Sequence, residues 1–183
     1  MPIFHINNKK VLFVHIPKNY GTFIENLLSK FSTTMYVNNN NVFNKELLFG
    51  QYNGNQYQHL TLNQIESLTD YKIDDFDIVF GLVRDPINRL VSSINWRIDH
   101  VYWEKIYKGK TKDEIIETVV NNYNSNSKFP HDLTQLEFIK GFNNKISLFT
   151  DLNECIHFLE KQLDINIDKK DKKNKINQSK KNI

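Results

Sequence analysis

Residues 11–24 read Val-Leu-Phe-Val-His-Ile-Pro-Lys-Asn-Tyr-Gly-Thr-Phe-Ile, and the architecture can be worked out from this stretch. The apolar, β-branched run Val11–Ile16 is typical of a buried strand, and Pro17 ends it. From Gly21 onward, apolar residues recur on one side of a helical pattern: Phe23, Ile24, Leu27 and Leu28. The stretch therefore predicts a strand, a tight loop and a helix in succession.

The loop between strand and helix, residues 17–20, has the features of an anion site. Such a loop points free backbone N–H groups at one place, and the helix dipole adds positive potential there. Gly21 lets the backbone approach a phosphate, Thr22 offers a hydroxyl, and Lys18 offers positive charge to a leaving oxygen. The Gly-x-x-x-x-Gly-Lys-Ser/Thr spacing of ATP-binding loops is absent. Taken alone, the segment is equally compatible with a connecting loop that carries a solvated lysine.

A second strand exit carries similar chemistry. The run Phe76–Val83 is the clearest strand of the sequence, and its near-continuous apolar character is typical of a central parallel strand. Asp85 and Pro86 follow as the N-cap and the first residue of a helix. Arg84 at the strand exit and Ser92 two helical turns later could grip one phosphate, the arginine through two parallel bonds.

Arg89 in the same segment has two interpretations. It contacts the same anion, or it braces the loop against a carboxylate. The plainest interpretation of the whole segment is that Asp85 caps the helix while Arg84 and Arg89 form surface ion pairs. The segment alone does not decide between these.

Further elements alternate along the chain. We predict strands over Thr33–Val37 and Lys145–Phe149, and helices over Thr61–Leu68, Thr111–Val120, Leu133–Lys140 (ended by Gly141) and Asp151–Leu163. This alternation favours an α/β fold, a three-layer parallel sheet with helices on both faces. Ligands of such sheets collect beyond the carboxyl ends of the strands, which is where both loops lie.

The composition sets outer limits on the function. The 183 residues suit one domain over residues 1–168 and a lysine-rich tail over 169–183. The net charge of +3 suits an anionic small ligand and gives no reason to expect nucleic acid. A single cysteine, Cys155, and the lack of a signal peptide or a bilayer-spanning apolar run lead us to expect a cytoplasmic protein. No cluster of His and Cys has metal-ligand spacing, so we expect no metal.

Taken together, the two loops resemble the sulfotransferases that use 3′-phosphoadenosine 5′-phosphosulfate (PAPS), above all the carbohydrate branch that includes the 2-O-sulfotransferases. The first motif of that family reads approximately His-x-Pro-Lys-Thr-x-Gly-Thr, and His15 through Thr22 stand at those positions. The second reads Arg-Asp-Pro-x-x-Arg-x-x-Ser, and Arg84 through Ser92 fill every fixed position. Asn19 and Tyr20 depart from the first motif, where Thr and a small residue are usual.

The resemblance implies a P-loop nucleotide-hydrolase-like sulfotransferase fold and a role for each loop. PAPS is the implied co-substrate, with Lys18 on its bridging oxygen and Arg84 with Ser92 on its 3′-phosphate. The first loop would hold the 5′-phosphosulfate through six residues: Lys18, Asn19, Tyr20, Gly21, Thr22 and Phe23.

A third stretch, Gln58–Leu62, is similar to a family segment in which a histidine deprotonates the acceptor hydroxyl. His59 is the implied base, because the ordinary pKa of histidine lies near neutrality. A lone histidine before a helix is more commonly structural. Two weaker similarities, over Asp132–Gly141 and Asn177–Ser179, extend the resemblance over most of the chain.

We therefore expect transfer of a sulfuryl group from PAPS to an acceptor hydroxyl, on a carbohydrate by resemblance alone. Two alternatives remain. The first is a P-loop-like nucleotide kinase or hydrolase that uses ATP and Mg²⁺. The second is a nucleotide-binding module with reduced catalytic capacity. Fold alone does not decide among them.

Overall fold

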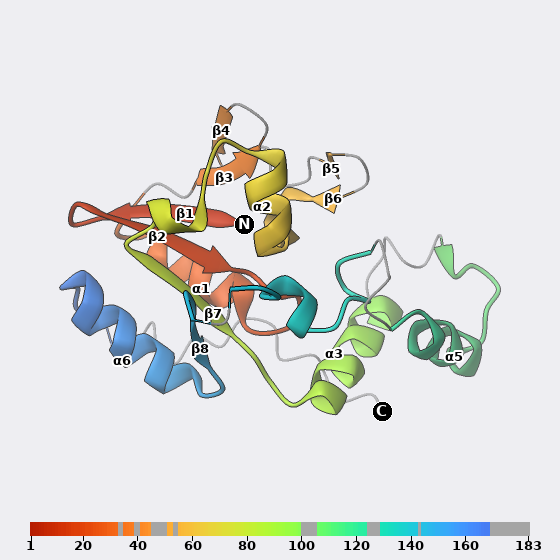
Figure 1. Cartoon of the computed structure of the whole chain (residues 1–183). Helices are drawn as coiled ribbons and strands as arrows, with labels where there is room; N and C mark the ends of the chain where they lie inside the picture. Colours follow the sequence, from red (N-terminus) through yellow and green to blue (C-terminus); the bar gives the residue numbers. More distant parts are fainter. Residues whose placement is uncertain are drawn as a thin grey trace.

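The computed structural model describes residues 1–32, 35–38, 41–44, 51–52, 55–99, 106–123, 129–142 and 144–168. Its centre is a six-stranded sheet with the strand order β4-β3-β1-β2-β7-β8 (Figure 1). The strands of this sheet are β1 (Pro2–Ile6), β2 (Lys9–Val14), β3 (Met35–Asn38), β4 (Asn41–Asn44), β7 (Ile78–Leu82) and β8 (Ser147–Phe149). A small separate hairpin joins β5 (Gln51–Tyr52) to β6 (Asn55–Gln56).

The parallel part of the sheet consists of β2, β7 and β8. Strand β7 lies between the other two and runs parallel to both, with Phe80 opposite Phe13 on one side and Ser147 on the other. All five residues of β7 are buried, which confirms the predicted central strand. Because β2 and β7 are parallel neighbours, the segments that follow them leave the sheet at the same edge. The predicted loops at Lys18 and Arg84 are therefore neighbours by topology.

The expectation of a wholly parallel sheet is wrong for β1, β3 and β4, which pair antiparallel. Strand β1 joins β2 through a two-residue turn, Asn7–Asn8, in which both φ angles are positive (48° and 64°). Two positive φ values match the type I′ turn that fits the twist of a hairpin, and Asn tolerates them better than most residues. The turn thus places the first strand antiparallel at the side of the parallel group.

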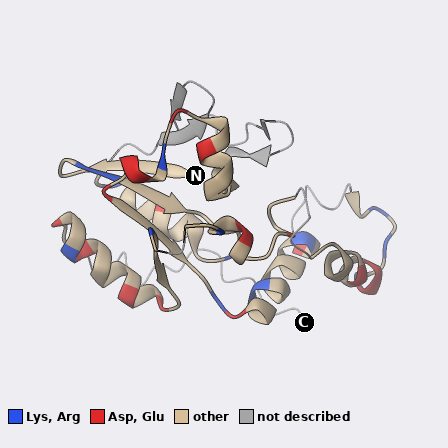
Figure 2. Cartoon of the chain, in the orientation of Figure 1, with Lys and Arg blue, Asp and Glu red and all other residues tan. Residues whose placement is uncertain are grey.

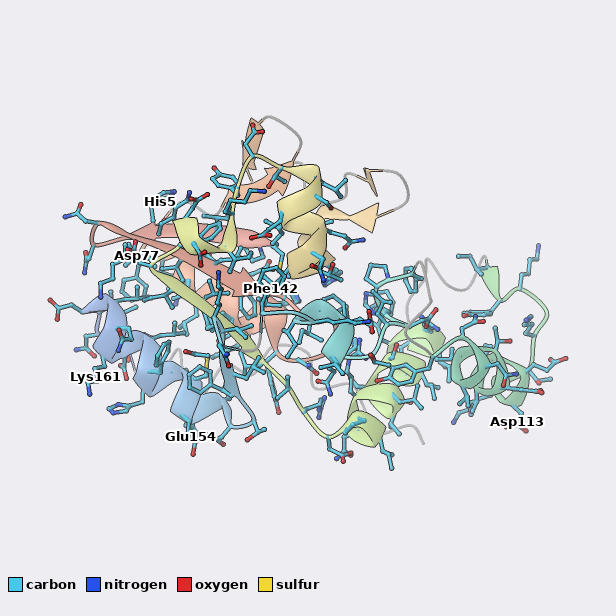
Figure 3. All side chains as sticks on the ribbon, in the orientation of Figure 1. His5, Asp77, Asp113, Phe142, Glu154 and Lys161 are labelled. Atoms are coloured by element: carbon cyan, nitrogen blue, oxygen red, sulfur yellow. The ribbon has the colours of Figure 1, made fainter. Side chains whose placement is uncertain are left out.

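Helices lie on both faces of the sheet, so the predicted α/β class is confirmed. Side chains of β2 alternate between two apolar clusters, with Val11 and Phe13 in one and Leu12 and Val14 in the other. The first cluster also contains the inner faces of α1 (Gly21–Leu28) and α6 (Leu152–Leu163). The second contains α2 (Leu62–Leu68) and a 3₁₀ turn, η4 (Leu136–Phe138). In Figure 3 the labelled Glu154 and Lys161 lie on the outer side of α6.

Two further helices, α3 (Pro86–Asp99) and α5 (Lys112–Asn122), pack against each other beside the sheet (Figure 1). Their contact forms a third apolar cluster that includes Ile94, Ile115 and Val119. The Asp85 carboxylate accepts a hydrogen bond from the backbone N–H of Asn88 at 2.8 Å, as an N-cap does. Thr111 forms a capping box with Glu114, so both predicted helix starts are confirmed.

The helix predicted over Leu133–Lys140 is wrong, because only the turn η4 forms there. A helix would use the Leu133 oxygen for the N–H of residue 137. In the structure that oxygen accepts a bond from Arg89 Nη1 at 2.8 Å instead. A tertiary contact thus replaces the helical one. The other two predicted helices, α2 and α6, form with the predicted caps Thr61 and Asp151.

Two remaining predictions concern the chain ends and the membrane. The tail over residues 169–183, with the stretch Asn177–Ser179, lies outside the described residues. Within the described part of the chain, no helix combines the length and the apolar composition needed to cross a bilayer.

Candidate active site

The loop between β2 and α1 has an unusual backbone. Lys18 and Tyr20 have φ angles of 68° and 62°, in the left-handed region that non-glycine residues rarely adopt. Tyr20 occupies the N-cap position of α1, and its side chain makes no capping hydrogen bond. The first N–H groups of α1 therefore have no side-chain cap from this residue. Strained backbone at a helix N-terminus is typical of a loop shaped for a ligand.

Gly21 has a packing role as well as its expected one. A Cβ atom at this position would lie 1.7 Å from Nε2 of His15, which is buried beside it. Any side chain at residue 21 would therefore displace the imidazole of His15. The glycine and the histidine of the first motif are coupled by this contact.

The second loop lies directly against the first. Arg84 donates a hydrogen bond from Nη1 to the backbone oxygen of Lys18 at 3.3 Å, and its guanidinium lies 5.7 Å from the centre of the Tyr20 ring. The Gln135 side chain holds the backbone of Arg84 on both sides. It accepts from the Arg84 N–H at 3.0 Å and donates to the Arg84 oxygen at 2.7 Å. The structure thus brings the two predicted loops together.

Lys18 and Arg84 form a centre of positive charge. Burial, and secondly the nearby Arg84 charge, together lower the pKa of the Lys18 ammonium to about 8. In the part of the chain that the structure describes, neither cation forms a salt bridge with a carboxylate. Figure 2 marks basic residues on the connection from β7 to α3, where Arg84 lies, and on α3, which carries Arg89 and Arg97. The arrangement favours an anion with more than one negative charge.

Other residues of the first loop serve mainly to fix it. The buried amide of Asn19 donates to the Leu82 oxygen at 3.0 Å and to Gln135 Oε1 at 2.6 Å, so it ties the loop to β7. Its Oδ1 atom is buried and has no hydrogen-bond partner among the residues that the structure describes. The Phe23 side chain packs in the core, which leaves only its backbone to face a ligand, whereas Thr22 is exposed at the start of α1.

Arg89 braces the site through two carbonyl oxygens and a hydroxyl, and not through the carboxylate that was considered for it. Its Nε donates to the Pro17 oxygen at 3.0 Å, and its Nη1 donates to the Leu133 oxygen at 2.8 Å and the Tyr123 hydroxyl at 2.9 Å. Its side chain is therefore committed to three segments of the protein, although Nη2 is buried without a partner. Ser92 lies half-buried on the next turn of α3.

His59 lies at the end of a 3₁₀ turn, η2 (Tyr57–His59), just before α2. Its Nδ1 and the His15 backbone oxygen are 3.0 Å apart, and because a carbonyl can only accept, Nδ1 carries the proton. Nε2 is then the basic nitrogen. Burial, and secondly the charge of His15, hold the pKa of His59 well below its ordinary value. The ring is therefore neutral at physiological pH and able to accept a proton.

A largely buried group of polar side chains next to His59 holds it in place. Glu25 on α1 is ion-paired with Nδ1 of His15, and Gln58 donates to both carboxylate oxygens of Glu25 at 3.1 Å. The rings of His15 and His59 meet edge to face, with their centres 4.5 Å apart. The carboxylate thereby fixes both the first motif and the turn that carries His59.

His131 is a site residue that the sequence analysis missed. Its ring centre is 5.2 Å from that of His59, and it stacks on Trp96 with ring centres 4.4 Å apart. The Lys18 ammonium lies 5.2 Å from the centre of the Trp96 ring. Trp96 and His131 therefore connect Lys18 to His59 in space. No spacing rule marks His131, because its partners come from elements distant in the sequence.

The described residues contain no group of three or more His, Cys, Asp or Glu side chains placed to hold a metal ion.

A protein-family model with the description "Sulfotransferase family" matches residues 2–180 of the chain. No match to a curated protein or to a solved structure is significant.

Proposed function

The chain belongs to the sulfotransferase family, and from that premise we propose that it transfers a sulfuryl group from PAPS to an acceptor hydroxyl. The family match supports sulfuryl transfer in general terms. The donor, the acceptor and the residue roles are our proposal, and the two strand-exit loops support it.

One observation carries the choice of donor: two adjacent cations, Lys18 and Arg84, without a neutralising carboxylate among the described residues. PAPS has anionic groups at its 5′ and 3′ positions, so it can engage both cations at once. Burial and like-charge repulsion already lower the pKa of Lys18. A bound polyanion relieves both penalties, which makes the site complementary to such a ligand.

The residues fit a phosphosulfate at the first loop and a 3′-phosphate at the second. The start of α1, where Tyr20 supplies no side-chain cap, is the group of backbone N–H donors that we assign to the 5′ end. Arg84 and Ser92 are assigned to the 3′-phosphate. When bound, PAPS supplies an activated sulfuryl group on a phosphate leaving group. Lys18 then stabilises the negative charge that develops on the leaving oxygen.

His59 is assigned to the acceptor side. Its Nε2 takes the proton of the acceptor hydroxyl while the hydroxyl oxygen forms its bond to sulfur and the bond from sulfur to the leaving phosphate breaks. The neutral state of the ring, enforced by burial, keeps Nε2 available for that proton. The Nδ1–H bond to the His15 oxygen holds the ring in the tautomer that the reaction needs.

A sugar hydroxyl is the proposed acceptor. The resemblance to the carbohydrate branch is what suggests it. We also propose a cytoplasmic location, from the composition alone.

Calorimetric titration of the full chain tests the donor proposal. Adenosine 3′,5′-bisphosphate should bind more tightly than ATP with Mg²⁺, because only the former presents a 3′-phosphate to Arg84. Adenosine 5′-phosphate is the matched control, since it lacks only that phosphate, and it should bind at least roughly tenfold more weakly. Tighter binding of ATP with Mg²⁺ would instead identify a kinase or hydrolase.

A transfer assay with ³⁵S-labelled PAPS tests the catalytic proposal. Oligosaccharides, phenols and amines serve as acceptors, and His59→Gln, whose amide can hydrogen-bond but cannot take the proton, is the inactive comparison. Bisphosphate binding without transfer to any acceptor class would favour a nucleotide-binding module. Transfer to phenols but not to sugars would overturn the proposed acceptor.

A further inference from the structure

Next to the Lys18 ammonium lies a series of stacked aromatic rings that have no role in the proposed mechanism. The ammonium lies 5.2 Å from the centre of the Trp96 ring. Trp96 stacks on His131 at 4.4 Å, with planes 7° from parallel. His131 stacks in turn on Phe129 at 5.1 Å and 16°. We call Trp96, His131 and Phe129 the ring stack.

A buried ion pair anchors the far end of the ring stack. The Arg97 guanidinium lies 5.1 Å from the centre of the Phe129 ring and is ion-paired with Asp132. Both members of this pair are almost completely buried. Arg97 follows Trp96 on α3, and Asp132 follows His131 in its own segment. The two segments are therefore joined twice, once by ring stacking and once by charge.

His131 is the central member of the ring stack. It is the ring that contacts both Trp96 and Phe129, and its edge also faces His59. Burial is the main cause that holds the pKa of His131 well below its ordinary value, and repulsion from a protonated His59 and from the Lys18 ammonium acts in the same direction. A neutral His131 ring is favourable at this position. The Lys18 ammonium lies near Trp96 and the Arg97 guanidinium near Phe129, so a protonated ring between them would add a third positive charge.

We propose that His131 is a positioning residue for the reaction: it supports Trp96 and, through Trp96, fixes the ammonium of Lys18. The kinetic part of this inference rests on the proposed function, whereas the structural part does not. The positive charge on Lys18 accelerates the transfer only if it lies next to the leaving oxygen. A misplacement of about 1 Å can lower the rate on the order of 100-fold.

Two substitutions in the full chain test whether a flat ring is needed at residue 131. His131→Phe keeps a flat ring in the stack, and His131→Ala removes it. His157→Ala, at an exposed histidine on the outer side of α6, is the control. If His131→Ala does not fold, as judged from its thermal melting, His131→Leu gives the same comparison, because it fills the space without a flat ring.

The first measurement needs no donor. Lys18 is labelled competitively with acetic anhydride over a range of pH, and the Lys18 peptide is quantified by mass spectrometry. In the wild type the group should titrate at a pKa of about 8. His131→Ala should raise this pKa towards the ordinary 10.5, because water reaches the ammonium once the support is gone. His131→Phe and His157→Ala should leave it unchanged.

The second measurement is steady-state kinetics with PAPS. His131→Ala should lower kcat by roughly 10- to 100-fold with a smaller change in KM for the donor, and His131→Phe should restore most of kcat. The inference is overturned if the titration of Lys18 in His131→Ala matches the wild type, or if His131→Phe is as slow as His131→Ala. If the labelling shift occurs but no variant transfers sulfate, positioning stands and the proposed function fails.

Discussion

The guanidinium of Arg84 donates a hydrogen bond to the backbone oxygen of Lys18 over 3.3 Å, so that cations from two different strand exits are held against each other. Burial lowers the pKa of Lys18 most, and the repulsion from Arg84 lowers it in the same direction. In the absence of an anion this repulsion disfavours the folded state, and a bound polyanion removes it. The predictions below follow from that relationship and from the contacts that maintain it.

Replacing Arg84 should change both ligand affinity and the titration of Lys18. In Arg84→Met, affinity for adenosine 3′,5′-bisphosphate should fall by roughly 10- to 100-fold, as measured by calorimetry. The pKa of Lys18 should rise at the same time, because a like charge is lost. Arg84→Lys keeps the charge but lacks the fork, so it should lose affinity while the pKa of Lys18 stays low. An unchanged affinity in Arg84→Met would show that the anion binds elsewhere.

The pH dependence of kcat/KM should be bell-shaped. His59 must be neutral to accept a proton, so activity should fall on the acid side through a pKa below 6.5. Lys18 must be protonated to stabilise the leaving oxygen, so activity should fall on the alkaline side through a pKa of about 8. In kcat the alkaline limb should move to higher pH, because the bound anionic donor favours the protonated ammonium. The absence of the alkaline limb in Lys18→Arg would assign it to Lys18.

Gly21→Ala should destabilise the protein strongly, because its Cβ would collide with the buried His15 ring. We expect a loss of about 3 kcal/mol in the free energy of unfolding, measured by urea denaturation. Gly141→Ala is the control: its φ of 88° disfavours alanine, but none of the described residues lies within 4 Å of the added atom, so about 1 kcal/mol is expected. The double variant His15→Ser, Gly21→Ala should be less destabilised than the sum of its single variants. Full additivity would contradict the contact.

Gln135→Ala should release the second loop. Its side chain makes hydrogen bonds to both backbone groups of Arg84 and accepts another from Asn19. Without them the Arg84 loop becomes free to move, and affinity for the bisphosphate should fall by about tenfold in calorimetry. The neighbouring, exposed Leu136 supplies the matched control, since Leu136→Ala removes no such bond. Equal effects of the two substitutions would remove Gln135 from the site.

The features that could be predicted from sequence are those with local signals. The capping box at Thr61, the caps Asp85 and Asp151, and the all-apolar strand around Phe80 form as expected. These signals depend on residues within four positions of one another. That Lys18 and Arg84 lie close together was also predictable, because the strands that precede them, β2 and β7, pair in parallel.

What could not be predicted depends on distant partners. The helix expected around Leu133 does not form. The Leu133 oxygen instead accepts a hydrogen bond from Arg89, which lies 44 residues away in sequence. His131 is defined by rings from other elements, and the antiparallel start of the sheet depends on a two-residue turn at Asn7 that carries no glycine. For Leu133 and His131 a long-range contact outweighs the local preference of the sequence, whereas the turn at Asn7 is a local feature without the glycine that marks most such turns.

The three hydrogen bonds of Arg89 have a consequence for the order of folding. They join Pro17, 72 residues earlier in the chain, to Leu133, 44 residues later, so the ligand loop gains its final shape only when both distant segments have docked. Closing loops of this length is entropically costly and slow compared with forming a helix. The capacity to bind the proposed nucleotide should therefore be acquired late in folding, so binding of adenosine 3′,5′-bisphosphate should report on the completed native state.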